Sequence, residues 1–301
     1  MATKILFVGK KLFNTIGILL GTTLLVFILI KMAPGNPYAG WSPELMNEFG
    51  VNQNIFVQYI HWLINLFMFN LGISVKSGQG VLGLVVSKYL ITVIIVSGAL
   101  VFSMLLSIPL GFLSVFKRDS RIVKILVKFF ELISSTPVFI LAYIIFFILI
   151  SQYKINITMR DDFHIIQICI FYTCTFIVLG IGNGTIIEFV EHLDNELRQI
   201  KNKMYMRAVT ARSANYTKHL IKSIAVPILT VIANRFVFLL SSAVIIEYIF
   251  TIRGIGLLSI QAAKDRDYPL ILGITVATII IVVLIKTLVE FIIKKISPNT
   301  A

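Results

Sequence analysis

Charged residues are scarce in this chain, and the hydrophobic residues collect in long runs. Lys, Arg, Asp and Glu make up 14% of the 301 residues, whereas soluble proteins carry about 25%. Hydrophobic residues make up 57%, which exceeds the share in a typical soluble domain. This composition places the chain in the class of membrane proteins.

Cysteine is almost absent, and no metal site stands out. Cys169 and Cys174 lie in one apolar run. Five residues apart, they do not share a helix face well and lack His or acidic neighbours at ligand spacing. We therefore expect free thiols and no disulfide framework. His164 beside Asp161 and Asp162 is also poorly spaced for a metal, so we interpret it as part of a solvated loop.

Motifs of nucleotide binding and hydrolysis are missing as well. The sequence contains no Gly-x-x-x-x-Gly-Lys-Ser/Thr phosphate loop, no Gly-x-Ser-x-Gly elbow and no His-Glu-x-x-His helix. We expect a chain that is not an enzyme and binds no cofactor of its own. Any step that needs energy would then draw it from another polypeptide or from an ion gradient.

Positive charge, by contrast, is in excess, with a net charge of +13. In a soluble protein this excess would suggest nucleic acid as a partner. Here no basic and aromatic platform stands apart from the apolar runs, so we expect no nucleic-acid binding. The concentration of Lys and Arg in cytoplasmic loops explains the charge better.

Six apolar stretches are long enough to span a membrane, which takes about 20 residues each. They cover about 12–30, 90–116, 129–150, 165–187, 225–250 and 270–293. Pro137 is expected to break or kink the third stretch, and Gly180, Gly182 and Gly184 to let the fourth bend or pack closely. Pro227 is expected to mark the start of the fifth. The first lacks a following cleavage site, so we expect it to be retained.

The distribution of cations predicts the orientation of the six spans. Both ends of the chain, the link at 117–128 and the polar segment Glu188–Lys222 fall on one side, and they carry more Lys and Arg than the opposite side. The positive-inside rule then places both termini and the polar segment in the cytoplasm. We expect a multi-pass membrane protein.

Two regions follow from this topology. Residues 1–89 would hold the first span and an extracytoplasmic amphipathic segment, in which 58–66 forms either an interfacial or lateral helix or part of a small external subdomain. Residues 90–301 would form the core of five spans, with a cytoplasmic loop at about 188–224.

Polar groups inside a span are costly and often functional. Asn234, Arg235 and Glu247 all lie in the fifth stretch. Arg235 and Glu247 are roughly 18 Å apart along one helix, so they cannot pair with each other. We interpret Asn234, Arg235 and Glu247 as candidates for the translocation pathway or a subunit contact, with anchoring of the turn Gly254-Ile255-Gly256 as the favoured role of Glu247.

Several motifs in a shared order resemble one family, the permease subunits of binding-protein-dependent ABC importers of the peptide/nickel type. Ala33-Pro34-Gly35-Asn36-Pro37 resembles the turn that closes the family's first span, and Ile108-Pro109-Leu110-Gly111 its element at the end of the second. Ala243–Phe250, Gly254-Ile255-Gly256 and Arg266-Asp267-Tyr268-Pro269 are similar to its AVIVExIF…GLG…RDYP sequence. The resemblance covers nearly the whole chain.

The resemblance implies an all-α, type I ABC importer permease fold with about six transmembrane helices. It also implies a coupling loop that seats in an ATPase subunit. That loop corresponds to the segment 205–213, with the residues Tyr205, Arg207, Ala208, Ala211, Arg212 and Ser213. Ser213 stands where the family has glycine, and the stretch before His219 is about one helical turn shorter than usual, so the seating of the loop differs from the family pattern.

The implied function is a permease that forms a pathway with a second, homologous permease. Two ATP-binding subunits, which bind ATP and Mg, would drive it, and an extracellular binding protein would deliver peptides or nickel and other metal chelates. The alternative is a secondary transporter driven by an ion gradient. That class predicts paired half-sequences and intramembrane acids, and neither a clear repeat nor an acid other than Glu247 well inside a span is found in the sequence.

Overall fold

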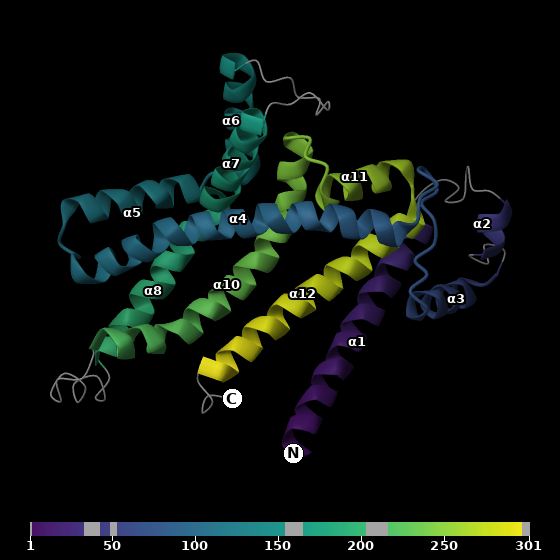
Figure 1. Cartoon of the computed structure of the whole chain (residues 1–301), viewed down its shortest axis with the longest axis horizontal. Coiled ribbons are helices and arrows are strands. Elements are labelled where there is room, and N and C mark those ends of the chain that lie inside the picture. The colour runs from purple at the N-terminus through teal and green to yellow at the C-terminus, as the bar shows by residue number, and fades with distance from the viewer. Residues whose placement is uncertain (1, 33–42, 49–52, 154–164, 203–215, 297–301) are drawn as a thin grey trace. The chain divides into compact units, whose positions relative to one another are not determined.

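The computed structural model describes residues 2–32, 43–48, 53–153, 165–202 and 216–296 (Figure 1). Within these ranges the regular elements are helices, and the one pair of bridged β residues is Ile73 with Gly80. The elements are α1 (Ala2–Met32), α2 (Pro43–Glu48), α3 (Ile55–Phe67), α4 (Val81–Phe116), α5 (Arg121–Ser134), α6 (Val138–Tyr153), α7 (Ile165–Ile181), η1 (Gly182–Gly184), α8 (Thr185–Asn202), α10 (Tyr216–Ile249), α11 (Ile255–Asp265) and α12 (Tyr268–Ile296). The all-α prediction is confirmed.

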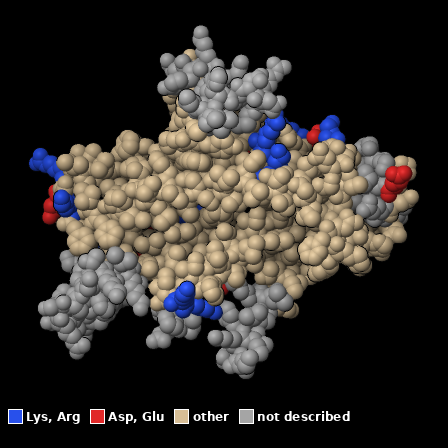
Figure 2. All heavy atoms as spheres, in the orientation of Figure 1, with Lys and Arg blue, Asp and Glu red and all other residues tan. Residues whose placement is uncertain are grey.

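Five helical stretches are long and apolar enough to cross a membrane. They are Thr15–Met32, Val81–Phe116, Cys169–Ile200, Ser223–Ile249 and Tyr268–Ile296. A sixth span exists if α5 and α6 are counted together, although they meet at an angle of 95°. The break falls at Pro137, as predicted, because proline lacks the amide hydrogen that would continue the helix. Figure 2 shows a face on which uncharged side chains dominate and charged ones appear in small separate groups.

The polar segment Glu188–Lys222 is more helical than its description as a loop implied. Glu188–Asn202 belongs to α8, and Tyr216–Lys222 belongs to α10. The apolar span of α10 begins at Ser223, close to the predicted start of the fifth span. The first-turn position expected for Pro227 was wrong, because this proline lies inside α10, well after Tyr216. The physical reason is packing, since an apolar face can hold a helix together despite polar residues on its other face.

The chain divides into two compact units. The first contains Met1–Leu90 and Leu258–Leu284. In it, Tyr59 and Trp62 of α3 are buried with Phe27 of α1 and with Leu272 and Val276 of α12. The stretch 58–66, predicted as an interfacial or lateral helix, lies within α3 and is helical.

Hydrogen bonds add to this contact between α3 and α1. The Tyr59 hydroxyl donates to the carbonyl of Leu20 at 2.9 Å and pairs with the hydroxyl of Thr23. The ammonium group of Lys31 donates to the side-chain oxygen of Gln58 at 2.5 Å. These bonds give the polar groups beside the apolar contact hydrogen-bond partners, as buried polar groups require.

The second unit contains Ile91–Leu257 and Ile285–Ala301. Its helices α6 and α7 lie side by side, and α8 packs against α10 (Figure 1). Between α7 and α8 the chain kinks at Asn183, which has a positive φ of 55°. Gly180 lets α7 approach α4 closely, because a Cβ there would lie 2.8 Å from the carbonyl oxygen of Ala99. The glycines at this point therefore serve both a bend and a close contact, as expected.

Candidate functional site

The predicted coupling residues lie outside the residues that the structure describes. Tyr205, Arg207, Ala208, Ala211, Arg212 and Ser213 all fall within 203–215. The helices on either side are described. Leu193, Leu197 and Ile200 near the end of α8 are buried against Leu220 and Ile224 near the start of α10.

This contact continues to a third helix. Ile108, Phe112 and Val115 of α4 pack against the same buried cluster. The two helices that flank 203–215 are therefore joined to each other and to a membrane-spanning helix by close-packed side chains. Because protein interiors have low compressibility, such a contact transmits displacement from one helix to the next.

Glu247 is the centre of a second candidate site. Its side chain is completely buried near the end of α10. Oε2 accepts hydrogen bonds from the backbone amides of Gly256 at 2.7 Å and Leu257 at 3.1 Å. Oε1 accepts a bond of 2.5 Å from the hydroxyl of Thr92 in α4, and that hydroxyl in turn accepts one from the amide of Ile255.

The arrangement is explained by the start of α11. The first amides of a helix have no partner within the helix and carry a partial positive charge. Glu247 and Thr92 together bind three successive amides, those of Ile255, Gly256 and Leu257. The contact with the Gly254-Ile255-Gly256 turn that the sequence suggested is present, and it is electrostatically favourable.

This turn requires glycine because its neighbours leave no room for a Cβ atom. A Cβ on Gly256 would lie 2.5 Å from the Cα of Val244 and 2.9 Å from the Glu247 carboxylate. A Cβ on Gly254 would collide with the same carboxylate. The two glycines let the chain come close enough to Glu247 for the amides to reach it.

Arg235 lies in a separate polar cluster, between α10 and the kink. Its guanidinium forms an ion pair with Glu188 of α8 and donates to the backbone carbonyl of Asn183 at 3.4 Å. The charged group also lies over the ring of Phe238, 5.1 Å from its centroid. The side-chain amide of Asn183 donates to the hydroxyl of Ser242 at 2.8 Å. The kink is thus attached to α10 at two positions.

Asn234 does not take part in either cluster. It is exposed on α10, whereas its neighbour Arg235 faces α8. The structure therefore separates the three candidates of the fifth span. Arg235 and Glu247 bind other helices of the same unit, and Asn234 points outward.

Several residues of these clusters were not singled out in the sequence. Thr92 is one hydroxyl in a long apolar run, and its partner lies in another helix. Glu188 looked like part of a solvated segment because further charges follow it. Asn183 carried the best available signal, since an Asn between two glycines favours a left-handed conformation at a kink.

Comparison with known proteins finds a matching family and several similar permeases. The family model of the binding-protein-dependent transport system inner membrane component matches residues 107–301. A probable peptide ABC transporter permease protein (y4tP) of Sinorhizobium fredii is 26% identical over 97% of this chain and 98% of its own length. The nickel import system permease protein NikB of Staphylococcus aureus is 28% identical over 96% of this chain and 90% of its own.

A solved structure shares the fold. It belongs to the MetNI methionine ABC transporter in an inward-facing conformation and is similar with a TM-score of 0.57. The match covers 71% of this chain and 96% of that chain, at 14% sequence identity. At this identity the likeness concerns the arrangement of helices.

Proposed function

The chain belongs to the family of inner membrane components of binding-protein-dependent transport systems, and from this premise we propose that it forms half of the translocation pathway of an ATP-driven importer. It is an ABC transporter permease of the peptide/nickel type, as its similarity to peptide and nickel permeases shows. A second, homologous permease would complete the pathway. Two ATP-binding subunits, which carry ATP and Mg, would provide the energy.

The observation that most supports coupling to an ATPase is the packing of α8 against α10 on both sides of 203–215. Leu197 and Ile200 contact Leu220 and Ile224, so both flanking helices would move together when the segment between them is displaced. We propose that Tyr205, Arg207, Ala208, Ala211, Arg212 and Ser213 contact the ATPase. The small residues would allow close approach and the arginines would match an acidic groove.

The kink at Asn183 and its contacts with α10 support a route for the movement into the membrane. Arg235 connects α10 with the carbonyl of Asn183 and with Glu188, so a shift of α8 acts on α10 beyond the cytoplasmic end. A kinked, glycine-rich segment is a natural hinge for switching between inward- and outward-facing states. Asn234, exposed on the same helix, is our candidate for contact with the pathway or with the second permease.

For the cargo we propose peptides first and nickel or another metal as a chelate second. An extracellular binding protein would deliver the cargo and do much of the selection. We place the chain in the cytoplasmic membrane of a bacterium with both termini in the cytoplasm, because the Lys and Arg distribution follows the positive-inside rule.

Co-purification tests the coupling proposal. The chain is expressed with the ATPase and permease genes that neighbour it on the chromosome, and retention of the ATPases is measured. We expect the wild type to retain them and the double substitution R207E/R212E to lose most of the retained ATPase, because like charges are then placed against the docking groove. As a matched control, K294E/K295E reverses two charges at the end of α12 and keeps retention.

Two results would count against the proposal. Unchanged retention with R207E/R212E would reject the placement of the docking residues. Absence of any retained ATPase with the wild type would favour the alternative of a transporter driven by an ion gradient.

A further inference from the structure

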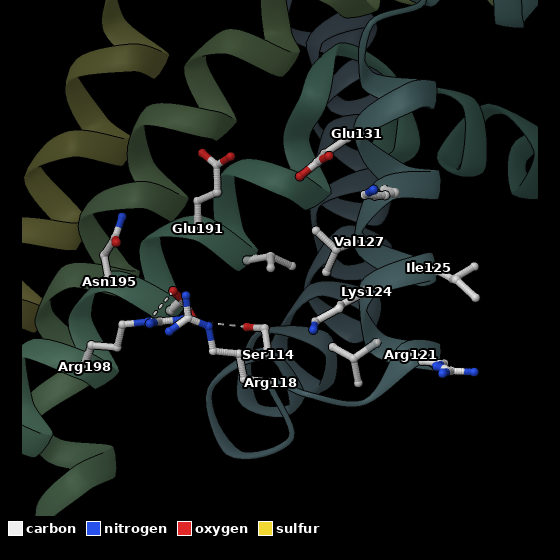
Figure 3. Close-up of a pocket in the computed structure, with 14 residues that line it drawn as sticks. Ser114, Arg118, Arg121, Lys124, Ile125, Val127, Glu131, Glu191, Asn195 and Arg198 are labelled. Atoms are coloured by element: carbon white, nitrogen blue, oxygen red, sulfur yellow. Dashed lines mark hydrogen bonds and ion pairs between the residues drawn. The ribbon is translucent and has the colours of Figure 1, made fainter.

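A pocket of about 790 Å³ lies between α5 and α8, beside the turn that joins α4 to α5 (Figure 3). The side chains of Val123, Val127 and Val190 form its apolar part. The lining also contains five cations, Arg118, Arg121, Lys124, Lys128 and Arg198. None of these residues belongs to the clusters around Glu247 and Arg235.

Three acids, Glu131, Glu191 and Asp194, face these five cations, so the lining keeps an excess of two positive charges. Asp194 is engaged by Arg198, with bonds of 2.6 and 3.0 Å, and by the hydroxyl of Ser114 at 3.3 Å. Figure 3 shows Glu131 and Glu191 toward one end of the pocket, with Arg118 and Lys124 toward the other. Within the described part of the chain we find no ion pair for Arg118 or Lys124. The pocket can therefore accept an anionic group at that end.

The position of the pocket along the chain points to the membrane interface. The apolar span of α4 ends at Phe116, and cations follow immediately in the turn. Lys and Arg directly after a span are typical of the boundary between hydrocarbon and headgroups. The predicted topology places this boundary on the cytoplasmic side, where anionic lipids are concentrated in cell membranes.

An apolar surface continues from the pocket along α5. Ile125 lines the pocket and is 65% exposed. Ile122, Phe129 and Leu132 are also exposed, and their spacing puts them on the same face of the helix as Ile125. A ligand that fits both features must carry an anionic head and a long apolar part.

We propose that this pocket binds the headgroup of an anionic phospholipid. The lipid phosphate lies between Arg118 and Lys124, and an acyl chain follows Ile125 and Phe129 along α5. Basic pockets between transmembrane helices are known to hold such headgroups. The bound lipid would fill the space between α5 and α8, the helix that leads to 203–215.

The binding test uses the purified full-length chain in detergent. The midpoint of thermal unfolding is measured with phosphatidylglycerol, with phosphatidylcholine of the same acyl chains, and with inorganic phosphate. We expect phosphatidylglycerol to raise the midpoint more than either of the other two. In the variant R118Q/K124Q the apparent affinity for phosphatidylglycerol should fall by roughly fivefold for each cation removed.

Two further variants test the contribution of the acyl chain and the effect of removing positive charge elsewhere in the protein. I125S/F129S should weaken the effect of phosphatidylglycerol through loss of the apolar surface. K294Q/K295Q removes two cations at the end of α12 and should leave the effect unchanged. If R118Q/K124Q does not fold, the charge-conserving R118K/K124R takes its place and should keep the preference for phosphatidylglycerol.

Clear results would overturn the proposal. An equal effect of phosphatidylcholine would exclude headgroup recognition, and an equal effect of phosphate would reduce the site to a binder of small anions. Unchanged lipid affinity in R118Q/K124Q, or loss of the preference in R118K/K124R, would also reject it. The measurement needs neither transport nor an ATPase, so its failure would leave the proposed function untouched.

Discussion

The carboxylate of Glu247 accepts a hydrogen bond of 2.7 Å from the backbone amide of Gly256, at the first turn of α11. The same carboxylate binds the hydroxyl of Thr92 in α4. A single buried acid therefore connects the end of one transmembrane helix with another helix and with the start of a third. Its environment consists of hydrogen-bond donors, which is how a buried acid is normally stabilised.

Substitution of Glu247 should destabilise the protein in proportion to the donors left without a partner. Glu247→Ala deprives the amides of Gly256 and Leu257 and the Thr92 hydroxyl of their acceptor. Each unsatisfied group costs about 1–3 kcal/mol, so we expect a loss of about 3 kcal/mol or more. Glu247→Gln keeps one acceptor oxygen and should lose less.

The midpoint of thermal unfolding in detergent measures this effect. Glu196→Ala on α8 is a suitable control, because Glu196 has no hydrogen bond or ion pair among the described residues. We expect the control to unfold near the wild-type temperature. Equal midpoints for Glu247→Ala and the wild type would show that the acid does not hold this turn together.

Gly256→Ala tests the space that the turn requires. The new Cβ would lie 2.5 Å from the Cα of Val244, a backbone atom that cannot easily move. We expect a loss of about 1–3 kcal/mol, as is typical of overpacking. In the control Gly83→Ala, the Cβ meets nothing within 4 Å, and replacing glycine inside a helix should stabilise by roughly 0.5–1 kcal/mol. Similar unfolding midpoints for the two variants would contradict the close contact.

The ion pair between Arg235 and Glu188 should show strong coupling in a double-mutant cycle. Glu188→Gln leaves the mostly buried guanidinium without its counter-charge, and Arg235→Met leaves the carboxylate alone. The double variant removes both charges, so its loss of stability should be smaller than the sum of the two single losses, by about 0.5–3 kcal/mol. Additive losses would mean that the two charges act independently.

Two substitutions of Asn183 distinguish the contribution of its backbone conformation to stability from that of its side-chain hydrogen bond. Asn183→Gly removes the bond to Ser242 but adopts the positive φ easily. Asn183→Ala removes the bond and also disfavours the left-handed conformation, which costs roughly 1–2 kcal/mol more. We therefore expect Asn183→Ala to unfold at a lower temperature than Asn183→Gly. The reverse order would indicate that the kink does not need this conformation.

The membrane-spanning helices could be predicted from the sequence because the bilayer sets their length and composition. Hydrocarbon demands long apolar helices, so the spans that end at Met32, Phe116 and Ile249 could be recognised by length and composition. The break at Pro137 followed from the chemistry of proline. These are local properties that need no knowledge of the tertiary structure.

Other features of the fold depend on contacts between helices, which cannot be predicted from a single sequence. The polar residues of α8 suggested a loop, and the packing of Leu193 and Leu197 against α10 and α4 explains why this part is helical. Pro227 lies within α10, where the surrounding helix overrides its preference for a first turn. The partner of Arg235 is far away in the sequence, so the pair could not be predicted from spacing along one helix.

Transport by the reconstituted complex is the most direct test of the proposed function. The chain, its second permease, its ATPase subunits and its binding protein are placed in proteoliposomes, and uptake of the cargo held by the binding protein is measured. The proposal predicts uptake that requires ATP on the ATPase side and continues after ion gradients are dissipated. Uptake that persists without ATP and stops when the ion gradient is dissipated would contradict it.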